Sequence, residues 1–166
     1  MNYINPTQVV FLLRSEKIMN IILLKPDKPA EVKVLESDKL SLNDMYKYCD
    51  CNMIDIRETA FKLLGDSEID MIFDVEFLLQ EKATINKVAS ELYGYRYHNE
   101  CLCGNVILSK KVLDEFGEIN NGGFSEEETT YLLEILENMS KVTAKKIYKL
   151  HPPMFEVMNF KKNNRE

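Results

Sequence analysis

The sequence has few of the residues from which familiar catalytic sites are built. Only two histidines occur among its 166 residues, His98 and His151, and no serine or cysteine stands in a Gly-x-Ser-x-Gly turn. The six glycines form no phosphate-binding loop after the first predicted strand. A hydrolytic triad and a phosphate loop therefore lack support, and we predict a protein that is not an enzyme and needs no cofactor.

Long hydrophobic runs are also absent. The longest, such as Ile21–Leu24, are far too short to cross a bilayer, and Arg14, Glu16 and Lys17 interrupt the N-terminal region where a signal peptide would lie. The apolar content of 45% and charged content of 29% are typical of a soluble globular protein. We expect a cytoplasmic protein with no membrane partner, in which the four cysteines stay reduced.

Apolar periodicity along the chain predicts an α+β fold. Strands are expected over residues 18–24, 31–35, 53–61, 69–75 and 102–108. Helices are expected over residues 42–49, 83–94 and 125–150. This order favours a single domain with a mostly antiparallel sheet of about five strands, two to three helices and a long C-terminal helix. The predicted division is an appendage over 1–18, a core over 19–124, the helix over 125–150 and a basic tail over 151–166.

The boundaries of the last helix have clear signals. Residues 120–123 are Asn-Asn-Gly-Gly, which is typical of a turn, and Ser125 with Glu128 predicts a capping box at the start of the helix. At the other end, His151 is followed by two prolines that cannot continue a helix.

The cysteines form two pairs with the same C-x-C spacing, Cys49 with Cys51 and Cys101 with Cys103. A zinc knuckle normally uses C-x-x-C, because its turn aims both sulfurs at one ion. Two residues along an extended strand lie about 6.5–7 Å apart, which is awkward for chelating a single ion. We favour buried thiols that pack as small hydrophobic groups, with a Cys-ligated metal protein kept as an alternative.

Charge is distributed unevenly along a chain whose net charge is −6. Residues 50–81 carry nine acids and two bases, a net charge of −7, whereas residues 141–166 carry seven bases and two acids, a net charge of +5. Asp70 and Asp74 share one face of a predicted strand, and we expect a solvated acidic face there rather than a metal site. The basic tail suits an acidic partner or a phosphate backbone.

The most unusual surface stretch lies between residues 92 and 99. Within six residues it contains Tyr93, Tyr95, Arg96, Tyr97 and His98. Tyrosine and arginine are enriched in the hot spots of protein interfaces, and tyrosine rings also stack on nucleic-acid bases. Tyrosines that simply cover the sheet are an equally good explanation.

Four short motifs carry a resemblance to a known family: "MNIILLKPDKPAEVKVLE", "IDMIFDVEFLLQEKATINKVASELYG", "CGNVIL" and "NGGFSEEE". Over about residues 19–130 the chain resembles an uncharacterised domain-of-unknown-function family from phages, plasmids and mobile elements, mostly of Gram-positive bacteria. The shared pattern includes an acidic strand end near Asp74, Asn86 at a helix start and a strand beginning at Gly104. Family members often carry two glycines where this chain has "YCDCN". The resemblance implies a mobile-element accessory protein in a bacterial cytoplasm.

These observations lead to one main hypothesis and two alternatives. The main hypothesis is a non-enzymatic phage or mobile-element protein that binds a host bacterial protein, with inhibition of a host defence system among the expected consequences. The candidate binding residues are Tyr93, Tyr95, Arg96, Tyr97, His98, Asn86, Asp70 and Asp74. The alternatives are a nucleotide or nucleic-acid binding module and a Cys-ligated metal protein. An exposed edge strand or the apolar "VVFLLR" segment could also support a homo-oligomer.

Overall fold

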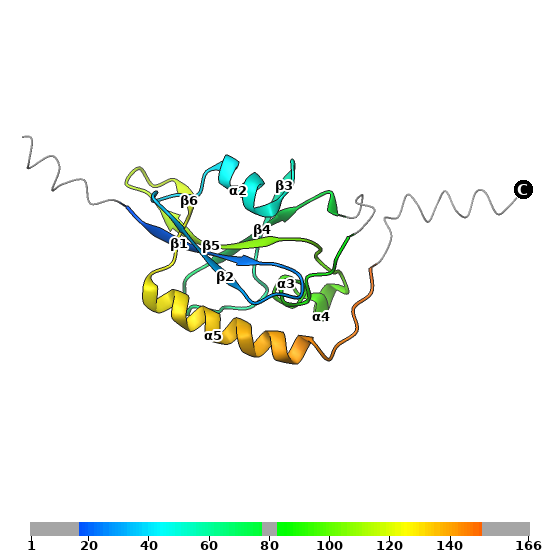
Figure 1. Cartoon of the computed structure of the whole chain (residues 1–166). Helices are drawn as coiled ribbons and strands as arrows, with labels where there is room; N and C mark the ends of the chain where they lie inside the picture. The colour runs from blue at the N-terminus through cyan, green and yellow to red at the C-terminus, as the bar shows by residue number, and fades with distance from the viewer. Residues whose placement is uncertain (1–16, 78–82, 151–166) are drawn as a thin grey trace, which may run out of the picture.

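An antiparallel sheet forms the centre of the molecule (Figure 1). The computed structural model of the chain describes residues 17–77 and 83–150, and within them the sheet has six strands. These strands are β1 (Met19–Leu24), β2 (Glu31–Leu35), β3 (Ile54–Glu58), β4 (Ile69–Asp74), β5 (Val106–Leu113) and β6 (Ile119–Gly122). Their order is β2-β1-β5-β4-β3, and β6 pairs with the later part of β5. The predicted α+β class with an antiparallel sheet is confirmed.

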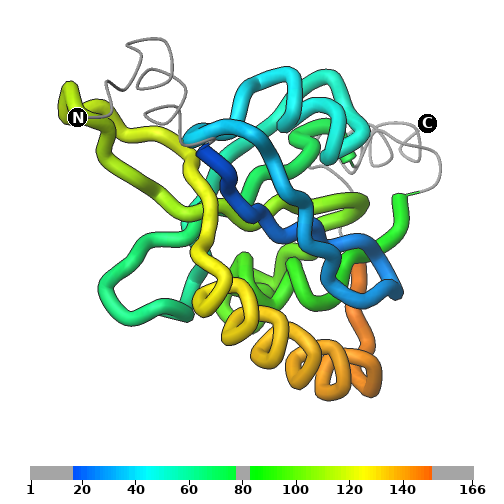
Figure 2. The backbone as a smooth tube through the Cα atoms, turned by 60° about the vertical axis from the view of Figure 1, so that its left-hand side comes forward, coloured from blue at the N-terminus to red at the C-terminus, as the bar shows by residue number. Residues whose placement is uncertain are grey.

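Helices cover both faces of this sheet. They are α2 (Leu42–Cys49), α3 (Lys87–Tyr93), α4 (Tyr95–His98) and α5 (Glu126–Thr143). Figure 1 shows α2 on one face and α3, α4 and α5 on the other, and the turned view in Figure 2 shows the long α5 lying along its side of the sheet. The protein is therefore a three-layer domain with the sheet in the middle.

Each central strand sends alternate side chains into two separate cores, as expected for strands buried on both faces. On β4, Met71 joins the larger core beneath α3 and α5, whereas Ile72 joins the smaller core beneath α2. On β5, Leu108 and Ile107 divide in the same way. The apolar run in β1 is buried on both faces too, and it lies within the strand predicted over residues 18–24.

Strand β6 corrects one of the sequence predictions. Residues 120–123 were expected to form a turn, but residues up to Gly122 pair with β5. Gly123 then passes very close to β1, because a Cβ added to it would lie 2.3 Å from the Cβ of Met19 and 2.9 Å from the backbone of Asn20. The glycine is required here for close approach rather than for a turn.

Helix α3 begins later than predicted. The pattern suggested a start near residue 83, but Asn86 is the N-cap, and its side chain accepts a hydrogen bond from the backbone N–H of Ala89. Ile85 instead forms a β-bridge with Cys103. The predicted end of the helix at residue 94 is confirmed, since Gly94 is the C-cap and has a left-handed φ of 104°.

Helix α5 begins at the predicted capping box but ends early. The Ser125 side chain and the Glu128 side chain bond reciprocally to each other's backbone N–H groups. The helix ends at Thr143 instead of residue 150, and the residues that follow it run towards α3. There the Lys146 ammonium and the Tyr148 hydroxyl both donate to the carboxylate of Glu91.

Two of the predicted segments lie outside the described residues: most of the appendage (1–16) and the basic tail (151–166). His151 falls in the latter. Within residues 17–77 and 83–150, no helix has the length and apolar character needed to cross a bilayer.

Candidate functional site

The predicted tyrosine-rich stretch forms the end of α3 and the short helix α4, with Gly94 between them. Tyr97 is 67% exposed, and Arg96 and His98 are exposed beside it. Tyr93 and Tyr95 are only half-buried and point elsewhere. The structure thus divides the five predicted residues into an exposed group and a supporting group.

The supporting tyrosines hold α4 against the body of the protein. The ring of Tyr93 packs edge-to-face on Phe73, with 5.7 Å between centroids, and the ring of Tyr95 lies 4.7 Å from that of Tyr148. On the outer side, the Phe61 ring lies 6.2 Å from Tyr97. We call Phe61, Arg96, Tyr97 and His98 the α4 surface.

A buried carboxylate fixes the chain segment behind α4. Glu91 accepts hydrogen bonds from Tyr148 Oη at 2.7 Å and from Lys146 Nζ at 2.9 Å. Burial by itself would raise the pKa of Glu91, but these two hydrogen bonds hold that pKa below its ordinary value. Burial and the nearby carboxylate raise the pKa of Tyr148, so its hydroxyl stays protonated and continues to donate. The base of the α4 surface is therefore held in one arrangement at neutral pH.

Asp70 and Asp74 do not form the solvated acidic face that the sequence suggested. Both are only 5% exposed. Asp70 Oδ2 accepts a 2.7 Å hydrogen bond from the Asn121 side chain, and Asp74 Oδ1 accepts one of 2.8 Å from the backbone N–H of Glu76. They do share one strand face, as predicted, but that face is covered by protein, so neither carboxylate is presented to a partner.

Asn86 also has a structural role. Its amide nitrogen donates to the backbone carbonyls of Leu24 at 3.1 Å and Gly104 at 2.9 Å, while its oxygen caps α3. Both amide hydrogens are used within the fold, so Asn86 joins β1, α3 and the start of β5.

The four cysteines are free thiols in two separate parts of the structure. Cys49, the last residue of α2, is buried and donates to the backbone carbonyl of Ile72, whereas Cys101 donates to that of Lys149. Burial raises the pKa of Cys49 and of Cys103 to about 12. In the part of the chain that the structure describes, no three His, Cys, Asp or Glu residues are grouped so that they could hold a metal ion. The prediction that the thiols belong to the core is confirmed for Cys49, Cys101 and Cys103, while Cys51 is only partly covered.

Comparison with known proteins identified no relative of this chain. No family model matches the sequence, and neither a curated protein nor a solved structure matches the chain. The resemblance to the mobile-element family therefore stays a prediction.

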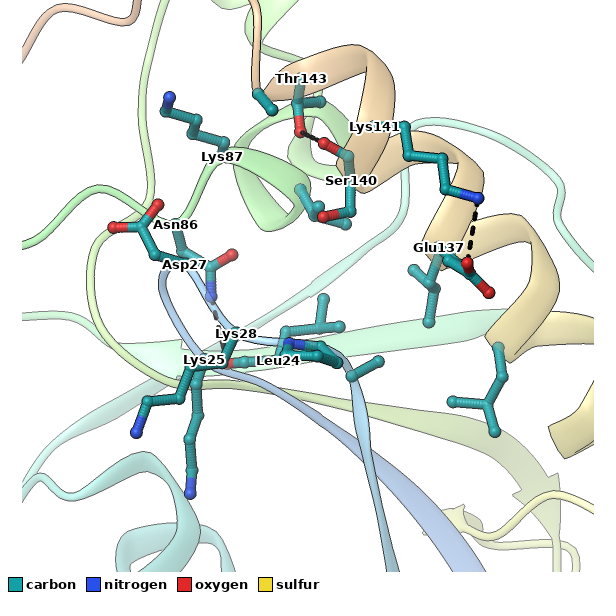
Figure 3. Close-up of a pocket in the computed structure, with 16 residues that line it drawn as sticks. Leu24, Lys25, Asp27, Lys28, Asn86, Lys87, Glu137, Ser140, Lys141 and Thr143 are labelled. Carbon is teal, nitrogen blue, oxygen red and sulfur yellow. Dashed lines mark hydrogen bonds and ion pairs between the residues drawn. The ribbon is translucent and has the colours of Figure 1, made fainter.

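A groove that the sequence did not indicate lies on the α5 side of the structure. It has a volume of about 750 Å³ and lies between the β1–β2 turn, the start of α3 and the second half of α5 (Figure 3). Its apolar lining includes Leu24, Ala30, Val88, Leu133 and Leu136. Because these residues come from three distant segments, no local motif could have indicated the groove.

Lysines surround this apolar lining. Figure 3 shows Lys25, Lys28 and Lys87 on one side of the groove and Lys141 on the other. Asp27 and Glu137 are the acidic residues of the lining within the described part of the chain. This lining carries a net charge of +2 in a protein whose net charge is −6.

Ion pairs occupy some of these lysines. Lys25 lies 3.0 Å from Glu31, and Lys141 lies 3.0 Å from Glu137. Among the described residues, Lys28 and Lys87 have no such pair, so they are the cations best able to meet an incoming anionic group.

Proposed function

We propose that this protein is a non-enzymatic binding protein that contacts a protein partner through the α4 surface. The observation that carries the proposal is the exposure of Tyr97, a large aromatic side chain held beside exposed Arg96 and His98 on a well-anchored helix. Soluble proteins expose single large apolar side chains routinely, but an aromatic, an arginine and a histidine gathered on one short helix have the composition of an interface centre.

Rigidity strengthens this interpretation. A binding surface loses less conformational entropy on association when its side chains are already held in place. The Tyr95–Tyr148 ring contact and the Glu91 hydrogen bonds support α4 from behind, and Gly94 allows the sharp change of direction between the two helices. Tyrosine itself has few rotatable bonds for its large contact area, so ordering Tyr97 costs little.

The charge of the α4 surface narrows the kind of partner. Arg96 is cationic, and the His98 imidazole beside it can add a hydrogen bond to a partner. An acidic patch on a partner protein would complement them, and the sequence resemblance adds the expectation that this partner is a host bacterial protein. Inhibition of a host defence system is one outcome that such binding would have.

A photo-crosslinking experiment tests the proposal. A photoreactive phenylalanine derivative replaces Tyr97 in one variant and Tyr131, an exposed tyrosine on α5, in a matched control. We expect irradiation in a host lysate to give one discrete adduct from position 97 and none from position 131. The captured protein is then purified and titrated against wild-type protein and against Arg96→Ala/Tyr97→Ala. Equal adducts from both positions, or unchanged affinity of the double variant, would contradict the proposal.

The nucleotide-binding alternative makes a different prediction at the same residues. Stacking on Tyr97 and contact with Arg96 would bind single-stranded oligonucleotides more tightly at low salt than at high salt. Fluorescence titration at two salt concentrations distinguishes the two functions. Salt-dependent binding that disappears in Arg96→Ala/Tyr97→Ala would favour the nucleic-acid function over the protein partner.

A further inference from the structure

The β5–β6 hairpin ends in an unusual apolar tip. Leu113 and Ile119 face each other across the hairpin and are 71% and 66% exposed, and Phe116 in the turn between them is 82% exposed. We call these three residues the hairpin tip. A cluster of three large apolar side chains at such exposure differs from the isolated ones that are normal on protein surfaces, and it marks an interaction site.

The turn that carries this tip is held in place by its own hydrogen bonds. Asp114 Oδ1 accepts from the backbone N–H groups of Phe116 at 2.9 Å and Glu118 at 2.8 Å, and its other oxygen accepts from the side chain of Asn120. These bonds lower the pKa of Asp114, so they persist at neutral pH. The tip is thus a preorganised projection rather than a loose loop.

Acidic residues surround the tip. Asp114, Glu115 and Glu118 lie within it or beside it, and residues 112–120 contain no basic residue. A partner surface for the tip must therefore combine an apolar hollow with positive charge around the opening. The groove between the β1–β2 turn and α5 has both properties, with its leucine and valine lining and with Lys28 and Lys87, which form no ion pair within residues 17–77 and 83–150.

The tip cannot enter the groove of its own molecule. Figures 1 and 2 both show the β5–β6 hairpin at one end of the sheet and the second half of α5 at the other. Strand β1 connects the two ends, because Lys17 just before it interacts electrostatically with Glu115 of the hairpin, whereas Leu24 and Lys25 at its other end line the groove. Contact between tip and groove therefore requires two copies.

We propose that the hairpin tip of one copy of this chain inserts into the groove of a second copy, with Phe116 on the apolar lining and Glu115 and Glu118 near Lys28 and Lys87. The contact is head-to-tail, so each copy keeps one unused tip or groove and further copies can add. This self-association uses neither Tyr97 nor Arg96 and is independent of partner binding at the α4 surface.

Sedimentation velocity of the full chain over a wide range of concentrations, up to the millimolar range, tests the proposal. We expect the wild type to show concentration-dependent association that weakens with added salt, since part of it is electrostatic. Phe116→Ser removes the centre of the tip, and Ser140→Trp fills the groove from an exposed position on α5. Each variant alone should lose about tenfold or more in association constant.

Mixing these two variants gives the decisive result. Phe116→Ser retains an intact groove and Ser140→Trp retains an intact tip, so an equimolar mixture should form a 1:1 dimer and nothing larger. Tyr131→Ser removes an equally aromatic but unrelated exposed side chain and should associate like the wild type. A wild type that stays monomeric at every concentration, a single variant that still associates, or a mixture that stays monomeric would each overturn the proposal.

Reversing charges provides a second test of the same contact. Lys28→Glu/Lys87→Glu and Glu115→Lys/Glu118→Lys should each associate more weakly than the wild type, and a mixture of the two should recover association through the reversed pairs. Lys62→Glu/Lys145→Glu makes the same charge change at exposed lysines outside the groove and should have a clearly smaller effect. Equal loss in both lysine double variants would overturn the role assigned to Lys28 and Lys87.

Discussion

The two faces of the sheet are covered by very different amounts of protein. On one face, the eighteen-residue α5 and the helix α3 enclose a wide apolar core that includes Leu108 and Leu132. On the other face, the eight-residue α2 covers a smaller core around Ile72 and Ile107. Apolar packing is thus more extensive on the α5 face than on the α2 face. The α2 face needs other interactions in addition to its apolar core.

Those other interactions are polar. Beside the α2 core, the Asn121 side chain donates to Asp70 Oδ2 at 2.7 Å and to Ser109 Oγ at 2.9 Å. Lys111 Nζ lies 2.5 Å from a Glu58 carboxylate oxygen and 2.9 Å from one of Glu68. One face is therefore stabilised mainly by apolar burial, and part of the other by a bonded polar cluster whose members depend on each other.

The largest expected effect comes from cavities on the two faces. Leu108 and Ile107 are neighbours on β5, both are fully buried, and they face opposite cores. We expect Leu108→Ala and Ile107→Ala each to cost about 2–5 kcal/mol of unfolding free energy, because a buried side chain is lost and a cavity remains. Leu108→Ala should cost more, since the short α2 can move to reduce its cavity more easily than α5 can.

Urea unfolding measured by circular dichroism gives both free energies. Val34→Ala, which truncates an exposed strand residue, is the control and should change the free energy of unfolding much less. A larger loss for Ile107→Ala than for Leu108→Ala would show that the α2 face is the less adaptable one and would reverse the comparison.

A smaller effect is expected from the polar cluster. Asn121→Ala removes the hydrogen bonds to Asp70 and Ser109, leaving the buried Asp70 carboxylate with Lys111 at 3.7 Å. Because the buried Asp70 carboxylate then loses the hydrogen bond from Asn121, we expect a loss of about 1–3 kcal/mol in unfolding free energy. Equilibrium unfolding of Asn121→Ala, Asp70→Ala and the double variant measures the coupling between the two residues. Strictly additive losses would show that Asn121 and Asp70 do not act together.

The features that local sequence determines were predicted well. Ser125 was expected at a helix start because its side chain can satisfy free backbone N–H groups, and it is the N-cap of α5. The family resemblance alone placed Asn86 at a helix start, and Asn86 is the N-cap of α3. Gly94 was expected to end α3, and it does so in the left-handed conformation. Strands over residues 18–24 and 31–35 were expected from the apolar pattern, and both are present as the paired strands β1 and β2.

The features that depend on distant partners were not predicted. Asp70 was expected on the surface, but it is buried. Its buried carboxylate accepts a hydrogen bond from Asn121, a residue fifty-one positions further along the chain that no local pattern connects with it. Residues 120–122 have the composition of a turn, yet pairing with β5 makes them a strand. Beyond the end of α5, Lys146 and Tyr148 donate to Glu91, which belongs to another helix. The groove is formed by three separate segments, and only the folded chain brings them together.

The smallest expected effect is a difference in thiol reactivity between the two sides. Cys49 at the end of α2 and Cys103 beside the start of α3 both have a pKa that burial raises to about 12, so at pH 8 either folded thiol is protonated and poorly nucleophilic. Alkylation by iodoacetamide must therefore follow local opening. Because α2 covers a smaller core than α3 and α5 do, Cys49 should be alkylated severalfold faster than Cys103.

Peptide mass spectrometry of timed reactions in a Cys51→Ser background measures both rates without interference from the partly exposed thiol. Urea should bring the rates together, since global unfolding exposes both thiols equally. Faster alkylation of Cys103 under native conditions would mean that the segment joining α3 to β5 opens before α2 does. The larger core beneath α3 and α5 would then not be better protected from opening than the smaller core beneath α2. The polar cluster beside α2 would have to stabilise the α2 face more than the size of its apolar core suggests.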